Sequence, residues 1–398
     1  MAMENLDFIA SVWRMLSSSL SWYFSWRRNT PPYLLIPASK VTADDDDEET
    51  AMAPPPSSDY LFCRLANKKL FRVKNGRSVL PDDAKCLMSS HGWLAFLNPR
   101  DCSLLLTNPL ISPVPPTISL PFLGTRYIRR LVMSSAPTSP TSTTDGDECI
   151  VMAIATKTNT LLHRKNMLFF CKPGDESWEV LDSELKHDYT VAYSSKDRLF
   201  YCIDGFANIE TWDLRGPSPL RICIDTSRIR TPNLPVSELN LRLNKSLRLK
   251  MYLVVDSCSG DVLLVWRYTA PLEDDGTIID LTDRRWTRIS FTTLRFDVYK
   301  LSVAKGSWDP VECLRDRVVF VGLCQPFILS AQDFPPGVVM PNSIYFSDDV
   351  QMYDDQKKDD VGIYNLRDFT VAPLFPSHHP FNNIPLPPIW FTPNRCYN

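Results

Sequence analysis

Two short apolar runs that each stop at Asn-Pro constrain the fold of this chain more than any other feature. The first, Trp93-Leu94-Ala95-Phe96-Leu97, follows Ser89-Ser90-His91-Gly92 and stops at Asn98-Pro99, and the second, Leu104-Leu105-Leu106-Thr107, stops at Asn108-Pro109. Proline cannot donate to a β-ladder and asparagine favours the turn before it, so each run predicts a strand that ends at a turn. Together they predict two strands of one β-meander.

Strand-like segments of this kind recur along the chain as far as Leu366. The candidate strands are 61–65, 70–73, 86–97, 104–107, 127–133, 150–155, 168–171, 178–181, 188–193, 199–203, 209–214, 251–255, 262–268, 296–301, 318–322, 343–346 and 362–366. With weaker candidates the chain holds about two dozen strands, which at about four per blade predict an all-β propeller of about six blades. Seven blades, or two separate β-domains, are the alternatives. The composition, with 33 prolines and 13 glycines, suits many short strands joined by proline-bounded turns.

Residues 1–30 differ from the rest of the chain. Apolar side chains at helical spacing predict a short helical segment between Met3 and Trp26, with a stripe formed by Leu6, Ile9, Trp13, Leu16 and Leu20. Arg14 and several serines interrupt it, which argues against a membrane span. Acidic residues near the start do not fit a signal peptide. An organellar transit peptide and a helix that packs on the main domain or on a partner both stay open.

Residues 31–57 are predicted to hold an extended segment and then an acidic and proline-rich insert. An extended, proline-bounded stretch at Pro31–Pro37 precedes an acidic run at Asp44–Glu49 and a proline run at Pro54–Pro56. The acidic and proline runs have too few apolar side chains to form a core, so this insert is predicted to be a disordered linker. Binding to a basic partner is the alternative. We therefore assign residues 58–398 to the propeller, with recognition loops expected at 134–147, 227–250 and 348–360.

Charge and cysteine content narrow the classes of partner and compartment. The formal net charge is only −3, from 43 Lys and Arg against 46 Asp and Glu, so no whole-chain field favours nucleic acid or an anionic membrane. The eleven cysteines are scattered without a Cys-x-x-Cys pair, as at Cys63, Cys171 and Cys202. They are expected to be small buried thiols in a reducing compartment, with no structural zinc site.

No catalytic, cofactor-binding or metal-binding residue is predicted, and the chain is expected not to be an enzyme. It has no Gly-x-Ser-x-Gly elbow, no phosphate loop and no dinucleotide fingerprint. His91 could serve as a general base, but a histidine in a strand turn with a local hydrogen bond is the interpretation we favour. His378-His379 is read as a solvated tail. Trp178 and Trp212 follow the strand registers and are expected in the blade core.

Two charged stretches are candidate binding sites. The acidic one lacks the spacing of a calcium loop and contains two lysines, so a solvated loop is favoured over a basic-partner site; its acids are Asp348, Asp349, Asp354, Asp355, Asp359 and Asp360. The basic one lacks interleaved aromatic residues, which disfavours nucleic-acid binding; its members are Arg228, Arg230, Arg242, Lys245, Arg248 and Lys250.

A series of ordered motifs gives the chain a family resemblance. They are Ser90-His91-Gly92-Trp93-Leu94, Asn108-Pro109-Leu110, Phe170-Cys171-Lys172-Pro173-Gly174-Asp175-Glu176-Ser177-Trp178, Thr211-Trp212-Asp213-Leu214, Asp333-Phe334-Pro335, Asn342-Ser343-Ile344-Tyr345-Phe346-Ser347-Asp348-Asp349 and Gly362-Ile363-Tyr364-Asn365-Leu366. Over residues 33–375 the sequence resembles the plant KIB-type β-propeller family, long catalogued as a domain of unknown function at the C-terminus of F-box proteins.

This resemblance implies a role in recognising proteins for ubiquitination. Members often carry an N-terminal F-box that docks on the Skp adaptor of a cullin-type ligase, while the propeller holds the substrate protein. Here Ser25-Trp26-Arg27 and Leu34-Leu35-Ile36-Pro37 resemble the end of such a box, but no Leu-Pro lies upstream and only about 24 residues precede Ser25. The stripe at Leu6–Leu20 is then a remnant of the box, a diverged adaptor-contact helix or a replacement targeting segment.

Two hypotheses of function follow. The first is a non-enzymatic substrate receptor of a ubiquitin ligase in the cytosol or nucleus, with a Skp adaptor and a substrate protein as partners. The second is an interaction propeller without a ligase role, sent to an organelle by its N-terminal segment. Neither requires a cofactor. The propeller residues that bind the partner cannot be read from the sequence, because recognition loops carry no fixed signature.

Overall fold

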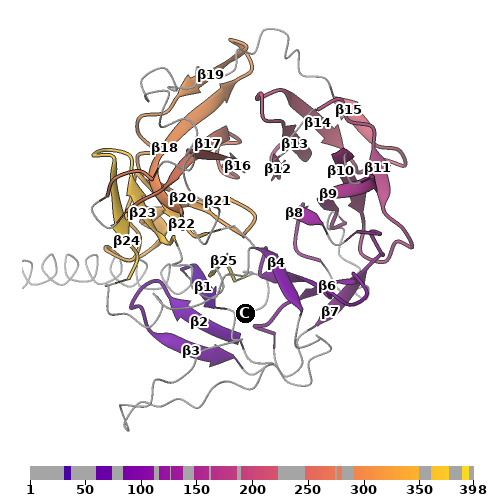
Figure 1. The fold of residues 1–398 in the computed structure, drawn as a ribbon, viewed down its shortest axis with the longest axis horizontal. Helices are drawn as coiled ribbons and strands as arrows, with labels where there is room; N and C mark the ends of the chain where they lie inside the picture. The colour runs from indigo at the N-terminus through magenta and orange to yellow at the C-terminus, as the bar shows by residue number, and fades with distance from the viewer. Residues whose placement is uncertain are drawn as a thin grey trace, which may run out of the picture.

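The chain folds as a ring of six β-sheets around a central axis, shown in Figure 1. The computed structural model describes residues 31–36, 60–73, 84–111, 116–125, 127–137, 148–160, 163–185, 190–222, 247–273, 276–279, 291–348, 360–375 and 388–393. This is the predicted all-β propeller, with six blades. The predicted N-terminal helical segment and the acidic insert lie outside these residues. None of the described helices is long and apolar enough to cross a membrane.

Four of the blades are four-stranded antiparallel meanders that run outward from the axis in chain order. Blade two holds β4 (Lys85–Ser90), β5 (Trp93–Leu97), β6 (Leu104–Thr107) and β7 (Thr117–Leu120), and blade three holds β8 (Ile128–Met133), β9 (Val151–Thr160), β10 (His163–Cys171) and β11 (Glu179–Leu181). Blade four holds β12 (Thr190–Ser194), β13 (Leu199–Ile203), β14 (Ile209–Asp213) and β15 (Leu220–Ile222), and blade five holds β16 (Arg248–Val255), β17 (Val262–Pro271), β18 (Phe291–Ser302) and β19 (Ser307–Pro310).

Blade one is closed by the far end of the chain. Its innermost strand, β25 (Ile389–Phe391), pairs antiparallel with β1 (Tyr33–Ile36), which continues into β2 (Tyr60–Arg64) and β3 (Leu70–Val73). In the register Leu34 lies opposite Trp390, and both side chains are buried. The stretch at residues 33–36, which sequence analysis describes as extended and proline-bounded, is therefore a strand of the propeller.

Blade six departs from the meander. Its five strands lie in the order β21 (Phe327–Ser330), β20 (Arg317–Val321), β22 (Ser343–Phe346), β23 (Gly362–Asn365) and β24 (Thr370–Pro373), and a 3₁₀ turn at Ala331–Asp333 follows β21. The pair β20 and β22 is parallel, with Val318 opposite Ser343. As a result the β20–β21 hairpin lies on the inner side of the blade and points its tip toward the axis (Figure 1).

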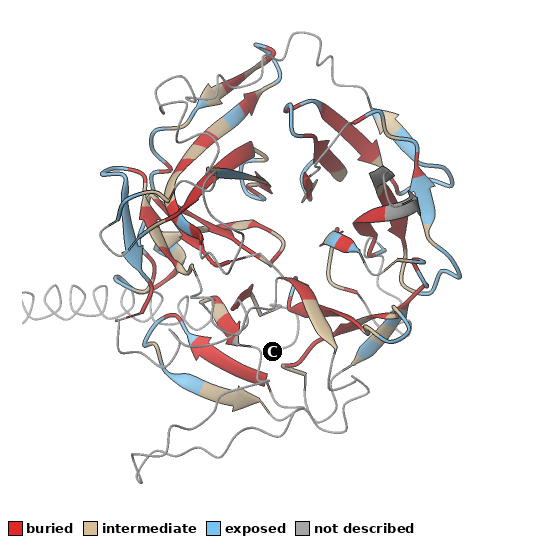
Figure 2. Ribbon diagram, viewed as in Figure 1, coloured by how far each residue is buried: buried red, intermediate tan, exposed pale blue. Residues whose placement is uncertain are grey.

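The core consists of six apolar layers, one between each pair of neighbouring blades. Successive side chains of a strand point to opposite faces of its sheet, so each strand supplies two layers. In β13, Phe200 and Cys202 face blade three, whereas Tyr201 and Ile203 face blade five. Figure 2 shows buried residues concentrated in the strands of all six blades. This arrangement explains why the blades read as apolar runs in the sequence.

The stretch 86–97 was predicted as one strand, and the structure corrects this. It is two strands, β4 and β5, joined by a two-residue turn at His91 and Gly92, whose φ angles are 49° and 79°. Two central residues with positive φ define the type I′ turn whose twist matches antiparallel strands. The predicted antiparallel pairing of the two Asn-Pro-terminated runs is confirmed, since β5 pairs with β6.

Candidate functional site: the axial pocket

A pocket of about 220 Å³ lies where the inner strands end at one mouth of the central channel. All six blades contribute to its lining. Its polar lining includes Ser90, His91, Ser134, Ser195, Ser257 and Thr392. Apolar side chains of the β20–β21 hairpin and of β16 complete the wall, including Phe327, Ile328 and Val255. We call this the axial pocket; hydroxyl groups dominate its polar surface.

Gln325, at the tip of the β20–β21 hairpin, spans the channel to reach blades two and three. Its backbone N–H donates to Ser89 O at 2.9 Å. Its side-chain amide pairs with the backbone of Met133, accepting from Met133 N at 2.9 Å and donating to Met133 O at 3.2 Å. These backbone partners fix which amide atom is oxygen and which is nitrogen, because one can only donate and the other can only accept.

The orientation of Gln325 determines the hydrogen bonds of its neighbours in turn. Ser90 Oγ lies 2.6 Å from Gln325 Oε1, which can only accept, so the hydroxyl proton of Ser90 points to Gln325. Ser90 Oγ also lies 2.7 Å from His91 Nδ1. With its one proton committed, Ser90 must accept there, and the neutral imidazole therefore carries its proton on Nδ1. This leaves the Nε2 of His91 with a lone pair.

The environment of His91 favours the neutral ring. Surrounding protein lowers the pKa of His91 to about 4, because the imidazolium would lose hydration there. By its surface area the residue is exposed, so water screens part of this effect. The prediction of a turn histidine with a local hydrogen bond is confirmed. Ser90 is not poised for attack on a substrate, since its proton is held by an amide oxygen instead of a base.

The mouth of the channel is tied together by further bonds between blades. Ser89 Oγ donates to Trp390 O, which joins blade two to the closing strand β25. The Nζ of Lys196 donates to Ser259 O at 2.7 Å, which joins the first turns of blades four and five. Contacts from nearly all blades therefore hold the pocket wall in place.

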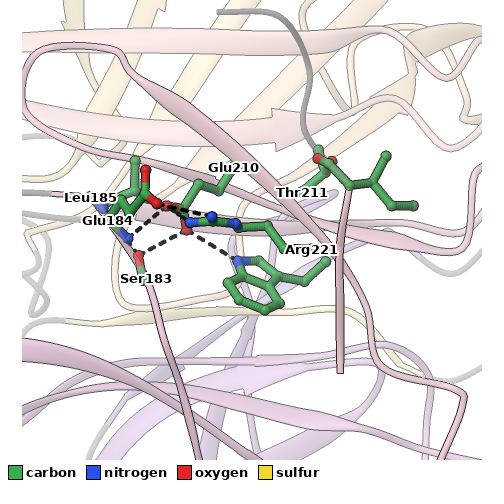
Figure 3. Close-up of polar contacts among 8 residues, drawn as sticks. Ser183, Glu184, Leu185, Glu210, Thr211 and Arg221 are labelled. Carbon is green, nitrogen blue, oxygen red and sulfur yellow. Dashed lines mark hydrogen bonds and ion pairs between the residues drawn. The ribbon is translucent and has the colours of Figure 1, made fainter. Parts of the chain in front are cut away.

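A separate polar cluster lies between blades three and four (Figure 3). The carboxylate of Glu210 on β14 accepts from Ser183 Oγ and from the Glu184 backbone N–H, both at 2.8 Å, and from Trp212 Nε1 at 3.3 Å. Arg221 lies 3.6 Å from the same carboxylate. The cluster fixes the segment after β11 against blade four, so its acceptors are used within the fold.

The acidic stretch at 348–360 is not solvated at its two ends, which corrects the prediction. Asp348 is buried, and the Asp360 Oδ2 forms an ion pair at 2.9 Å with the buried Arg267. The same guanidinium donates to Ser347 O at 2.8 Å. Arg267 therefore closes the base of this segment, while residues 349–359 lie outside the described part. No group of three or more potential metal ligands occurs among the described residues.

None of the remaining residues singled out in the sequence is among the described residues that line the axial pocket. Trp212 is buried in the layer between blades three and four, and Trp178 packs at the edge of the layer between blades two and three. Arg248 stacks 3.6 Å from the centroid of the Phe291 ring, so this member of the basic stretch serves packing. The stripe Leu6, Ile9, Trp13, Leu16 and Leu20 and His378-His379 lie outside the described residues.

Five of the nine cysteines in the described ranges are buried as expected, whereas Cys86 and Cys102 are half-buried and Cys258 and Cys313 are exposed. All nine cysteines in the described ranges are free, and Cys63, Cys171 and Cys202 are buried. Burial raises the pKa of Cys63 to about 11, which keeps it protonated at neutral pH.

Sequence reasoning found the turn at His91 but missed the rest of the axial pocket. Gln325 carries no local signal, because its partner Met133 lies 192 residues away. The serines that line the pocket also carry no signal when each is considered alone. One pattern was available: the strand-like runs ending at Ser89-Ser90, Ser134-Ser135 and Ser194-Ser195 each finish in paired serines.

A family model described as the KIB1-4 beta-propeller matches residues 62–365. No curated protein matches. Similar solved structures include TolB from Acinetobacter baumannii, with 10% identity and a TM-score of 0.39 over 84% of this chain and 61% of the TolB chain. The Malassezia sympodialis allergen Mala s 1 gives 8% identity and a TM-score of 0.35 over 83% of this chain and 86% of its own. This chain thus spans less than two thirds of the TolB chain.

The family model carries the assignment. It covers well over half of the sequence and extends from blade one into blade six. The resemblance inferred from the ordered motifs is thereby confirmed, and the chain belongs to the KIB1-4 β-propeller family.

Proposed function

We propose that this propeller is a non-enzymatic receptor that holds a substrate protein for a cullin-type ubiquitin ligase in the cytosol or nucleus of a plant. The observation that carries the receptor role is the axial pocket, where all six blades bring polar groups to one mouth of the channel. Propellers recognise partners at such faces, where loops vary on a rigid frame. The ligase role draws on the family resemblance, in which an N-terminal F-box reaches the Skp adaptor.

The chemistry of the pocket supports binding over covalent catalysis. The Ser90 hydroxyl donates to the Gln325 amide, and the Nδ1 of His91 donates to Ser90. A nucleophilic serine needs the reverse polarity, with a base that accepts its proton. The pair therefore serves to shape the wall, and recognition by hydrogen bonding is the role it supports.

The adaptor role is tested by co-purifying the full chain with a plant Skp adaptor. We expect retention of the wild-type chain and its loss in a Leu16→Asp, Leu20→Asp variant, which places charges on the predicted helical stripe. The matched control is Ser11→Asp, Ser18→Asp, which adds the same charges to the opposite side of that helix. Failure of the wild-type chain to retain the adaptor would remove the ligase role and leave an interaction propeller, including the organellar alternative.

A further inference from the structure

Several hydrogen-bonding groups of the axial pocket have no partner within the described residues. Ser134 Oγ accepts from Ile150 N at 2.9 Å, and its own proton finds no acceptor among them. The residue is buried and lines the pocket, so a ligand in the pocket can accept this proton. His91 is exposed, and by the tautomer argument above its Nε2 has a lone pair that water or a ligand can meet. Ser134 is buried, and buried polar groups are normally satisfied, so a bound ligand is one way to satisfy its hydroxyl.

The pocket offers these two groups in complementary senses. Ser134 supplies a donor, and His91 Nε2 supplies an acceptor. Ser195, Ser257 and Thr392 add hydroxyls that can act in either sense. A ligand that both donates and accepts hydrogen bonds can pair with Ser134 and with His91. A group that only accepts is repelled by the lone pair of His91 Nε2.

Charge narrows the ligand further. No Asp, Glu, Lys or Arg occurs among the described residues that line the pocket. Moving an ion from water into such a site costs free energy without a counter-charge to offset it. Part of the wall is apolar, through Phe327, Ile328 and Val255, and can contact methylene groups.

We infer that the axial pocket binds the neutral carboxamide of an asparagine or glutamine side chain presented by the recognised protein. The amide N–H₂ donates to His91 Nε2, and the amide oxygen accepts from Ser134, while the methylenes lie on Phe327 and Ile328. A carboxylate places lone pair against lone pair at His91, and an ammonium group enters without a counter-charge. This inference rests on the proposed receptor function, which it deepens by naming the recognised chemistry.

The test uses the full chain and single-residue probes that isolate the side chain. N-acetyl-glutamine methylamide, the matching glutamate derivative and the matching lysine derivative are titrated at pH 7 while the histidine ring C–H signals are followed by NMR. His91→Asn identifies the signal of His91, because asparagine keeps the positive φ that the turn before Gly92 needs.

We expect a saturable shift of the His91 signal with the glutamine probe at millimolar concentration. The glutamate and lysine probes should bind about tenfold more weakly or worse, equivalent to roughly 1.4 kcal/mol. Ser134→Ala should weaken the glutamine probe by about 2- to 10-fold, as for loss of one neutral hydrogen bond. Ser218→Ala, in an exposed turn of blade four, is the matched control and should leave binding unchanged. Thermal melting establishes that both variants are folded.

Two results would overturn the inference: no saturable shift with the glutamine probe, or binding of the glutamate or lysine probe as tight as that of glutamine. The outcome is separable from that of the adaptor experiment. Probe binding without adaptor retention would remove the ligase role and keep the pocket chemistry. Adaptor retention without probe binding would keep the ligase role and remove the proposed pocket chemistry.

Discussion

Arg267 and the axial pocket are both polar regions inside the ring, yet they differ in how far their hydrogen bonds are satisfied. Arg267 has five N–H donors. They meet Thr293, Tyr252, Ser347 and Asp360, the last through both its backbone oxygen and its carboxylate. At the axial pocket, Ser134 and His91 keep unused capacity among the described residues. A saturated cluster points to a structural role, and an unsaturated one points to recognition.

The largest effect is expected at Arg267. Arg267→Ala leaves Asp360 and Ser347 without their buried donor and removes the guanidinium that lies 4.8 Å from the Phe346 ring. We expect the free energy of unfolding to fall by about 3–5 kcal/mol, as for other broken buried ion pairs. Chemical denaturation measures it, with Arg215→Ala, from an exposed ion pair in blade four, as the control. Equal stability of the two variants would contradict a structural role for Arg267.

A smaller loss of stability is expected at Gln325. This residue lines the axial pocket, yet its side-chain amide is hydrogen-bonded within the fold. Gln325→Leu removes the amide that pairs with Met133 and accepts from Ser90. We expect a loss of about 1–3 kcal/mol, because backbone groups of Met133 are left unsatisfied. The matched change Gln332→Leu, at an exposed position next to β21, should have little effect. Thermal melts that place both variants at the wild-type midpoint would show that the hairpin tip does not hold the channel together.

The smallest effect is expected from protonation of His91, because this side chain is exposed and water screens much of the cost of its charge. The pKa of His91 is lowered to about 4 in the folded protein, below the ordinary value of 6.5. Between these pH values the unfolded chain binds a proton that the folded chain does not, so the free energy of unfolding falls as the pH falls from 6.5 toward 4. Melting midpoints of wild type and His91→Asn between pH 7 and pH 4.5 measure this. Wild type should lose stability more steeply, and parallel curves would place His91 in an ordinary aqueous environment.

The sequence predicted local features well and long-range ones poorly. The strands at 93–97 and 104–107 were found because short apolar runs and Asn-Pro stops act over a few residues. The turn at His91 was expected, but the candidate strand 86–97 ran through it, since an apolar run does not reveal the two positive φ angles at His91 and Gly92. The parallel pairing of β20 with β22 and the reach of Gln325 to Met133 depend on contacts between distant segments. Most of the axial pocket belongs to that second class.

The pairing of β25 with β1 also sets an order of events during synthesis. Blades two to six can each pair their strands as soon as they leave the ribosome, whereas β1 waits for a strand encoded near the end of the chain. At typical translation rates that wait lasts on the order of tens of seconds. Throughout it, the inner edge of β1 is a bare template for pairing with other chains. The first blade is therefore the one whose native pairing stays incomplete longest during synthesis, and a stop codon before β25 would leave it incomplete.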